Sequence, residues 1–206
     1  IFGEPDQAGA VSVTDARLLL LPVRSLQGPF RWVTCPYVLD RYRRDCRLGG
    51  TALEPFRLAG IAPGRALAAD AGTMFLEEMT LEAVRADLEV LAREVGQLVY
   101  HPSLRERLLS VLTVASDEDF GHLACSALPA NAHNALDDPA NVDENPWYET
   151  VPPETLFYAL LLTRSADVRP LQYLKELFEQ YPYLQMGGNE TGGQGWCVVS
   201  WADEPK

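Results

Sequence analysis

The sequence is poor in lysine, histidine and cysteine, and it has no long hydrophobic run. Its four cysteines stand far apart and form no Cys-x-x-Cys pair, which argues against structural zinc and against a disulfide framework; they are Cys35, Cys46, Cys125 and Cys197. We expect them to be reduced and buried. The longest apolar run, LLLLPV at 18–23, is too short to span a membrane, and no basic-then-apolar signal opens the chain. We therefore expect a cytoplasmic protein with no membrane partner.

Length and charge narrow the function classes. The 206 residues suit one domain, with or without insertions. The net charge of −12 argues against a nucleic-acid partner, because phosphate binding relies on lysine and arginine. Yet residues 1–60 carry eight arginines against six acidic residues, and most of these arginines are clustered: Arg17, Arg24, Arg31, Arg41, Arg43, Arg44 and Arg47. The pattern is compatible with a local basic face on an acidic protein.

Hydrophobic periodicity and turn residues predict an alternation of strands and helices. Strands are predicted at 11–23, with Pro22 ending the strand, and at 30–34, 154–163 and 196–201. Helices are predicted from Pro36, over 80–98 with Thr80 as cap, after Pro102, after Ser116 and from Arg169. Residues 48–73 indicate an insertion or an extended loop, and 129–153 a hairpin or projecting loop. This order is typical of an α+β domain with helical insertions.

The stretch MGGNETGGQGW at 186–196 holds five glycines. It lacks the Gly-Lys-Ser/Thr ending of a phosphate-binding P-loop, and it is not a GxGxxG turn between a strand and a helix. The pattern favours a hairpin turn between two strands. Close approach of the bare backbone to another surface is the alternative interpretation.

Three segments together resemble one family. They are AGAVSVTDARLLLLPVRSLQGPFRWVTCPYVL at 8–39, LDDPANVDENPWYETVPPETLFYALL at 136–161, and LQMGGNETGGQGWC at 184–197. In that order they are similar to the backbone RAMP subunits of type III-B CRISPR effector complexes, the fourth Cmr subunit. The resemblance implies a ferredoxin-like (RRM-like) RAMP core over 1–206, which we expect to be N-terminally incomplete because the chain opens at Ile1 in a loop-like stretch. It also implies a helical insertion region at 48–128, a thumb loop at 134–151 and a glycine-rich loop at 186–196.

The same resemblance implies the partners. Copies of such a subunit stack along a guide RNA (crRNA) together with other Cmr subunits, and the thumb of each copy distorts the paired target RNA at regular intervals. A glycine-rich loop suits this task, because backbone N–H groups bind phosphates without reading the bases. The implied RNA contacts are Arg24, Ser25, Trp147, Gly187, Gly188, Asn189, Glu190, Thr191, Gly192, Gly193 and Gly195. Gln27 and Gln194 stand where the family often has basic residues, and a surface ion pair is the alternative role for Arg24.

Cleavage of the target RNA is implied as well. The family's catalytic aspartate lies in an N-terminal segment that is absent from this sequence, and Asp15 belongs to a different motif. By resemblance, Glu149 and Tyr148 are auxiliary catalytic residues beside the cleavage site, and a divalent metal, Mg²⁺ or Mn²⁺, is expected as cofactor. His133, Asp137 and Asp138 indicate a solvated turn rather than a metal site. The alternative function is a non-catalytic RNA-binding filament subunit.

Overall fold

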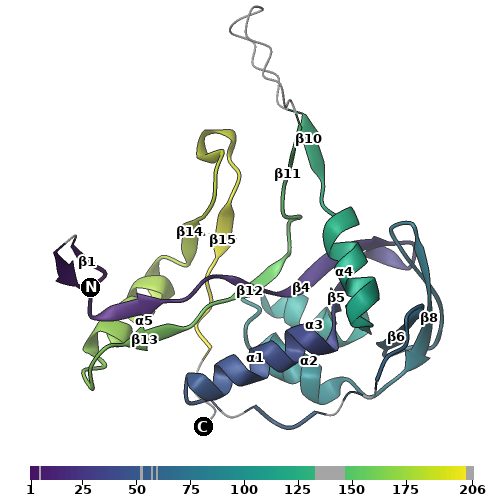
Figure 1. The fold of residues 1–206 in the computed structure, drawn as a ribbon, viewed down its shortest axis with the longest axis horizontal. Helices are drawn as coiled ribbons and strands as arrows, with labels where there is room; N and C mark the ends of the chain where they lie inside the picture. Colours follow the sequence, from purple (N-terminus) through teal and green to yellow (C-terminus); the bar gives the residue numbers. More distant parts are fainter. Residues whose placement is uncertain (5, 52, 57, 59, 133–146, 203–206) are drawn as a thin grey trace, which may run out of the picture.

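The computed structural model describes residues 1–4, 6–51, 53–56, 58, 60–132 and 147–202. Its helices are α1 (Pro36–Leu48), α2 (Glu89–Gly96), α3 (Pro102–Val111), α4 (Asp117–Ser126) and α5 (Arg169–Gln180), with a 3-10 turn η1 (Glu190–Gly192). Its strands are β1 (Gly3–Glu4), β2 (Gln7–Ala8), β3 (Val11–Val13), β4 (Arg17–Ser25), β5 (Gly28–Thr34), β6 (Arg65–Ala68), β7 (Gly72–Leu76), β8 (Met79–Arg85), β9 (Leu112–Ala115), β10 (Ala130–Ala132), β11 (Trp147–Glu149), β12 (Leu156–Tyr158), β13 (Leu161–Thr163), β14 (Tyr183–Gln185) and β15 (Trp196–Val198). The predicted α+β class is confirmed (Figure 1).

Six strands form a barrel-like sheet. The hydrogen-bonded order is β12-β4-β5-β9-β6-β8-β7, and β7 also pairs with β4 through Leu76 and Ser25. Most neighbouring strands are antiparallel, whereas β5 with β9 and β6 with β8 run parallel. The extra pairing joins the two ends of the six-stranded set, so β12 is left as an added strand at the side of β4.

Strand β4 carries the apolar run and is buried on both faces, since Leu19, Leu20 and Leu21 are at most 1% exposed. The prediction that Pro22 ends this strand was wrong. The strand continues to Ser25, and Pro22 lies opposite Trp32 of β5. Proline is tolerated here because β12 pairs with β4 only as far as Leu20, so no second strand needs an N–H group at position 22.

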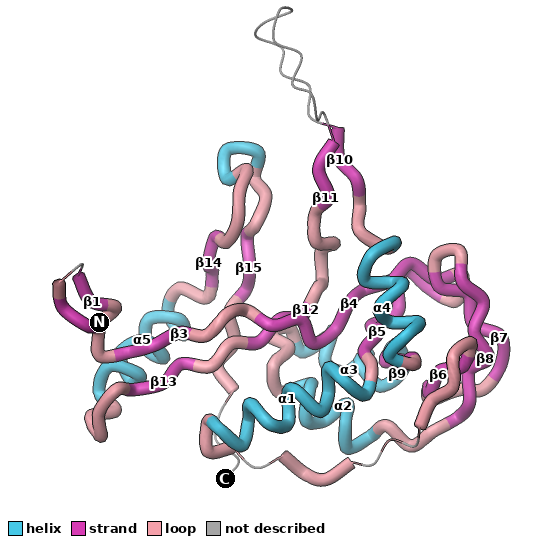
Figure 2. The backbone as a smooth tube through the Cα atoms, viewed as in Figure 1, coloured by secondary structure: helices cyan, strands magenta, loops and turns pink. Residues whose placement is uncertain are grey.

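The long strands predicted at 11–23 and 154–163 are each divided in two. Residues 14–16 separate β3 from β4, and residues 159–160 separate β12 from β13. The two breaks face each other: Thr14 N donates to Leu160 O at 3.0 Å, and Leu160 N donates to Thr14 Oγ1 at 2.9 Å. Strands β3 and β13 therefore leave the barrel as an antiparallel ribbon (Figure 2). We call this ribbon, α5 and the β14–β15 hairpin the outer lobe.

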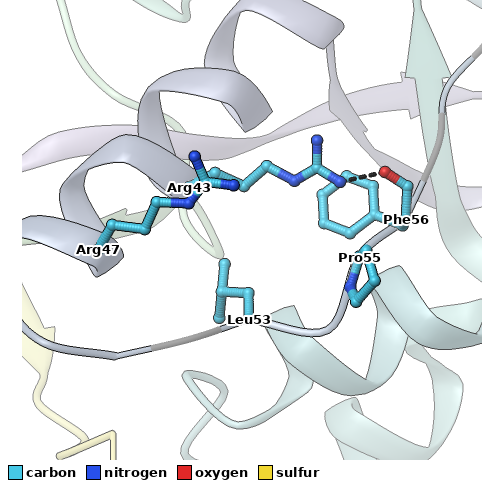
Figure 3. A pocket seen from close by; sticks show the side chains of 5 residues that line it. All are labelled: Arg43, Arg47, Leu53, Pro55 and Phe56. Carbon is cyan, nitrogen blue, oxygen red and sulfur yellow. Dashed lines mark hydrogen bonds between the residues drawn. The ribbon is translucent and has the colours of Figure 1, made fainter.

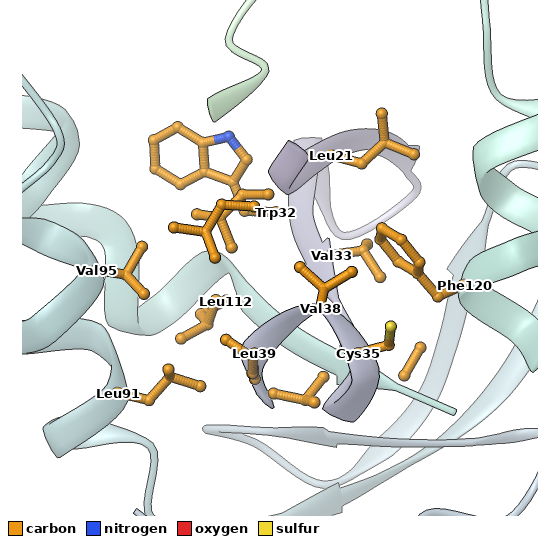
Figure 4. Close-up of a cluster of buried hydrophobic side chains, with 14 of the residues drawn as sticks. Leu21, Trp32, Val33, Cys35, Val38, Leu39, Leu91, Val95, Leu112 and Phe120 are labelled. Carbon is orange, nitrogen blue, oxygen red and sulfur yellow. The ribbon is translucent and has the colours of Figure 1, made fainter. Parts of the chain in front are cut away.

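The main core lies between the barrel and its helices. One continuous cluster draws residues from the barrel strands and from the helices α1 to α4, and Figure 4 shows part of it; the labelled members include Leu21, Trp32, Val33, Leu39, Leu91, Val95, Leu112 and Phe120. Burial of each such side chain contributes about 1.5–3 kcal/mol to stability. Among the described residues of the outer lobe, only Val11 and Leu174 are buried apolar side chains. The barrel therefore supplies most of the hydrophobic stabilisation.

The helix starts follow the predicted signals. Pro36 and Pro102 stand in the first turns of α1 and α3, where a missing N–H costs nothing. Ser116 caps α4 by accepting a hydrogen bond from Asp119 N at 3.0 Å. All four cysteines are free; Cys35 and Cys46 are buried as expected, whereas Cys125 is exposed and Cys197 is partly exposed.

The prediction of one helix over 80–98 was wrong for about half of this range, and this is the largest error in the predicted secondary structure. Residues 79–85 form β8, paired with β6 on one side and β7 on the other, and only Glu89–Gly96 are helical. Thr80 therefore lies within a strand and caps no helix. The region 48–128 holds strands β6 to β9 in addition to α2, α3 and α4, so it is mixed rather than helical.

Candidate functional site

Two hairpins extend from the body toward the same side of the molecule in Figures 1 and 2. One is the β14–β15 hairpin with the glycine-rich turn, residues 183–198, which we call the glycine hairpin. The other is formed by β10 and β11 and is called the thumb base. The thumb loop predicted at 134–151 lies outside the described residues from 134 to 146, as do His133, Asp137 and Asp138.

The glycine hairpin confirms the predicted turn between two strands. Its pairs are Tyr183 with Val198, Leu184 with Cys197, and Gln185 with Trp196. Beyond the last pair, Met186 N donates to Gly195 O at 2.8 Å. Gly187, Gly188, Asn189, Glu190, Gly192 and Gly193 are all exposed. The turn is therefore open to solvent and to any partner that approaches it.

The glycines of this turn are not equivalent. A Cβ atom on Gly195 would lie 2.0 Å from Met186 O, and its φ of +79° favours glycine. Gly188 has no positive φ and no atom within 4 Å of a built Cβ. Gly195 is thus required by the hairpin itself, while the local structure does not require glycine at 188.

Three amides of the turn already have acceptors within it. Gly192 N donates to Asn189 O at 3.0 Å, Gly193 N to Glu190 O at 2.9 Å, and Gln194 N to Asn189 O at 3.3 Å. Asn189 adopts a left-handed conformation, φ 58°, and its Nδ2 donates to Gln194 Oε1 at 3.0 Å. These three N–H groups are therefore not open to a phosphate. The N–H groups that could be offered lie in the first half of the loop, around Gly187 and Gly188. For Thr191 the structure places the backbone in η1.

The thumb base places the predicted auxiliary residues on one strand. In β11, Trp147 pairs with Ala132, Tyr148 with Asn131, and Glu149 with Ala130. Glu149 is exposed, and the next residue, Thr150, donates its N–H to Pro129 O at 3.0 Å. The WYE string therefore sits where the thumb joins the body.

Two hydrogen bonds anchor the segment that follows the thumb base. Trp32 Nε1 donates to Glu154 O at 2.7 Å, where Glu154 has a φ of 69°. Tyr158 OH donates to Asp45 Oδ2 at 2.6 Å, and Arg17 Nη1 donates to the same oxygen at 2.6 Å. These contacts join β5, α1 and β4 to the strand leaving the thumb. Sequence reasoning missed all of these residues as positioning groups.

Asp45 is the centre of this network and is only 8% exposed. Its burial alone would raise its pKa, but the hydrogen bonds from Tyr158 and Arg17 outweigh this effect and hold the pKa below its ordinary value of 3.8. Burial and the contact with Asp45 raise the pKa of Tyr158, so the phenol stays protonated as a donor. The sequence did contain a signal for this role. Asp45 lies on the apolar face of the helix that was predicted to begin at Pro36, and an acidic residue there needs a buried partner.

Arg24 and Ser25 lie at the end of β4 on the rim of the barrel. Arg24 donates to Glu77 through Nε at 2.8 Å and Nη2 at 2.6 Å, and its side chain is 85% exposed. Ser25 Oγ donates to Gln27 Oε1 at 2.9 Å. The surface ion pair considered as the alternative for Arg24 is thus present. The guanidinium group nevertheless remains on the surface of the molecule.

Four of the clustered arginines lie on α1, and only two of them form an exposed basic surface. Arg41 Nη2 donates to Leu18 O at 2.5 Å. Arg43 lies 3.9 Å from the centre of the Phe56 ring and donates to Phe56 O (Figure 3). A cavity of about 230 Å³ lies here and is lined by Arg43, Phe56, Arg47, Leu53 and Pro55. Arg44 and Arg47 are exposed, whereas Arg41 and Arg43 are partly buried and donate hydrogen bonds to backbone carbonyl groups.

The described residues provide no group of three His, Cys, Asp or Glu side chains that could hold a metal ion. None of the helices in the described ranges is long and apolar enough to cross a membrane.

Comparisons with known proteins agree with the resemblance. No protein-family model matches the sequence. The chain is 32% identical over 218 residues to the CRISPR system Cmr endoribonuclease Cmr4 of Pyrococcus furiosus, covering 97% of this chain and 73% of that protein. A crystal structure of oligomeric Cmr4 from Pyrococcus furiosus matches with a TM-score of 0.76 at 30% identity, over 97% of this chain and 76% of the other.

A more distant structure shares the fold. The apo state of the type III-B Cmr-β complex contains a chain that matches with a TM-score of 0.69 at 18% identity, over 98% of this chain and 73% of that one. The identity to Pyrococcus furiosus Cmr4 extends over nearly the whole sequence and includes both hairpins within its span. The chain therefore belongs to the Cmr4 family of type III-B CRISPR backbone subunits.

Proposed function

We propose that the chain is a backbone subunit of a type III-B CRISPR ribonucleoprotein that holds crRNA by its sugar-phosphate backbone and cleaves the paired target RNA at regular intervals. The observation that carries the proposal is the exposed glycine hairpin, whose first half presents open backbone at Gly187 and Gly188. Peptide N–H groups bind phosphate without selecting a base, as a subunit that must accept every guide requires. The Pyrococcus furiosus relative is a Cmr endoribonuclease. The finer classification as a ferredoxin-like RAMP core is part of this proposal and is supported by the strand–helix units β5–α1 and β9–α4.

Self-assembly is supported by the surface of the outer lobe. Large aromatic side chains stand exposed on α5, directly after it and on the glycine hairpin: Tyr173 is 56% exposed, Tyr181 60%, Tyr183 61% and Trp196 61%. A surface this apolar is typical of an interaction site, and the lobe buries little of its own. Copies of the same chain are the proposed occupants, in line with the oligomeric crystal structure of the relative.

The thumb supplies the proposed link between binding and cleavage. An A-form duplex holds each ribose 2′-OH out of line with its own phosphate, so an intruding hairpin that displaces one nucleotide can bring nucleophile, phosphorus and leaving oxygen into line. Glu149 is exposed at the thumb base, where a carboxylate can accept a proton from the 2′-OH or orient a water. Repeated copies along the guide would give evenly spaced cuts.

Replacing Gly188 by valine tests the binding mode. Because a Cβ at this position meets nothing within 4 Å, the hairpin should stay folded while the side chain blocks close approach of RNA. We expect affinity for guide RNA to fall about tenfold for every sequence, as for the loss of one charge-assisted contact, in filter-binding or anisotropy assays. Gly60→Val is the matched control, since Gly60 is equally unobstructed. A loss confined to some guide sequences would contradict backbone recognition.

Replacing Glu149 by glutamine tests the catalytic role. The substitution keeps the shape and removes the base, so the single-turnover cleavage rate of target RNA should fall about 100-fold while target capture stays unchanged. Glu78→Gln, at an exposed position in the turn between β7 and β8, is the control for loss of one negative charge. Equal losses in capture and cleavage would assign Glu149 to binding. A wild-type complex that never cleaves would support the non-catalytic filament subunit instead.

A further inference from the structure

A second cavity opens at the mouth of the barrel. The turn between β4 and β5, the turn between β6 and β7, and the last turn of α3 surround a space of about 350 Å³. This volume is within the range of sites that hold a nucleotide-sized ligand. Its polar lining residues are Gln27, Arg31, Asp70, Thr73, Arg107 and Ser110.

Arg31 is the most informative of these residues because it is a half-buried cation with only neutral hydrogen-bond partners. Its Nε donates to Thr113 Oγ1 at 2.8 Å and its Nη2 to Leu112 O at 3.2 Å. Six ion pairs are formed among the described residues, and none includes Arg31. Burial lowers the pKa of Arg31, and the negative charge of Asp70 opposes this effect without outweighing it. A guanidinium has five N–H donors, and these two bonds use two of them.

The rest of the lining adds positive charge and open backbone. Arg107 is exposed on α3 and also lines the cavity, so the lining contains two arginines and one acidic residue, Asp70. Gly28 and Gly72 line the same space, and a Cβ built on either would meet nothing within 4 Å. The cavity thus combines excess positive charge with room for a ligand to approach the backbone, which suits an anion.

Its position favours RNA as the source of that anion. Gln27 joins the cavity to Ser25: its Oε1 accepts from Ser25 Oγ at 2.9 Å, and its Nε2 donates to Thr73 O at 3.0 Å. Arg24 and Ser25, the proposed guide contacts, therefore lie on the same rim. Phe30, which also lines the cavity, offers an aromatic surface for a base or sugar.

We propose that this barrel-mouth cavity binds a phosphate of the RNA strand, with its nucleotide, through Arg31 and Arg107. The inference rests on the proposed RNA-binding function and adds a contact point distinct from the glycine hairpin. Asp70 opposes the phosphate by charge and limits its affinity. The site would hold the strand by its backbone at the edge of the barrel.

The test uses the purified chain and a fluorescein-labelled oligouridine, with anisotropy measured over a range of salt concentrations. Arg107→Gln, an exposed substitution that leaves the core intact, should weaken binding about tenfold and reduce the slope of log K against log salt by about 0.7, the loss of one phosphate contact. Asp70→Asn should strengthen binding severalfold. Arg44→Gln, which removes an exposed arginine of α1, should change the slope by much less. Arg31→Met should act like Arg107→Gln wherever thermal unfolding shows that it remains folded.

The outcomes separate the possible occupants. Arg107→Gln and Arg44→Gln that behave alike would overturn the proposal. An oligoglutamate probe that binds through Arg107 while oligouridine does not would also overturn it, and would assign the cavity to an acidic protein partner. If Gly188→Val loses oligouridine but the cavity variants keep it, only this inference fails. If the wild-type chain binds no oligouridine, the proposed function fails with it.

Discussion

Replacing Asp45 by alanine is expected to lower the free energy of unfolding by about 3 kcal/mol. The substitution removes the acceptor shared by Arg17 and Tyr158 and leaves the buried Tyr158 hydroxyl without its partner. Asp40→Ala is the matched control on the same helix, because the Asp40 side chain is 63% exposed and lies 3.5 Å from Arg43. That change should cost less than about 0.5 kcal/mol in urea unfolding. Similar losses in both variants would show that Asp45 is not a buried structural centre.

The lowered pKa of Asp45 leads us to expect that the stability of the fold depends on pH. The folded-state pKa of Asp45 lies below its ordinary value of 3.8, so the ionised carboxylate stabilises the fold above that pH, and the contribution is lost as the pH falls through the folded pKa. The stability gap between wild type and Asp45→Ala should therefore be constant near neutral pH and narrow below about pH 4. A gap that widens in acid would contradict the assigned hydrogen bonds.

Replacing Gly195 by alanine is expected to open the glycine hairpin and to abolish most RNA binding. The added Cβ would lie 2.0 Å from Met186 O, and alanine at a φ of +79° costs about 1–2 kcal/mol before any clash. Hydrogen exchange should show lost protection at the Met186 amide, which donates to Gly195 O. Gly188→Ala is the control and should leave protection unchanged, because it meets no neighbour. Intact protection in Gly195→Ala would mean that the hairpin tolerates a shifted turn.

The parts of the fold that could be predicted are those with a local signal. Pro36, Pro102 and Ser116 mark helix starts through their own backbone chemistry, and each helix begins as expected. The glycine-rich turn was likewise recognised as a hairpin from its residues alone. Such features need no knowledge of what lies opposite them in the fold.

The strand β8 was missed because its alternation is concealed. Leu81 and Ala83 face the core, but the outward residue Val84 is also apolar and is 38% exposed. Together with Leu88, Leu91 and Leu98 it completes a 3.6-residue pattern that favours a helix. Pairing with β6 and β7 determines the outcome, and that information is not local.

The site residues that were missed depend on long-range contacts. Glu77 binds Arg24 from 53 positions away, and Asp45 binds Tyr158 from 113 positions away. No spacing rule relates such pairs in the sequence. The resemblance predicts roles for Glu149 and the glycine turn, but it carries no information on the groups that hold the thumb base in place.

The facing breaks at Thr14 and Leu160 have a geometric consequence. They let the β3–β13 ribbon leave the barrel, so the length of this ribbon sets how far the rest of the outer lobe, α5 and the glycine hairpin, stands from the barrel. In the view of Figure 1 the ribbon and its continuation into β4 and β12 pass beneath both hairpins. Each residue pair adds about 3.4 Å to an antiparallel ribbon. Insertions there would change the separation of the two proposed RNA contact points stepwise, without altering the chemistry of either one.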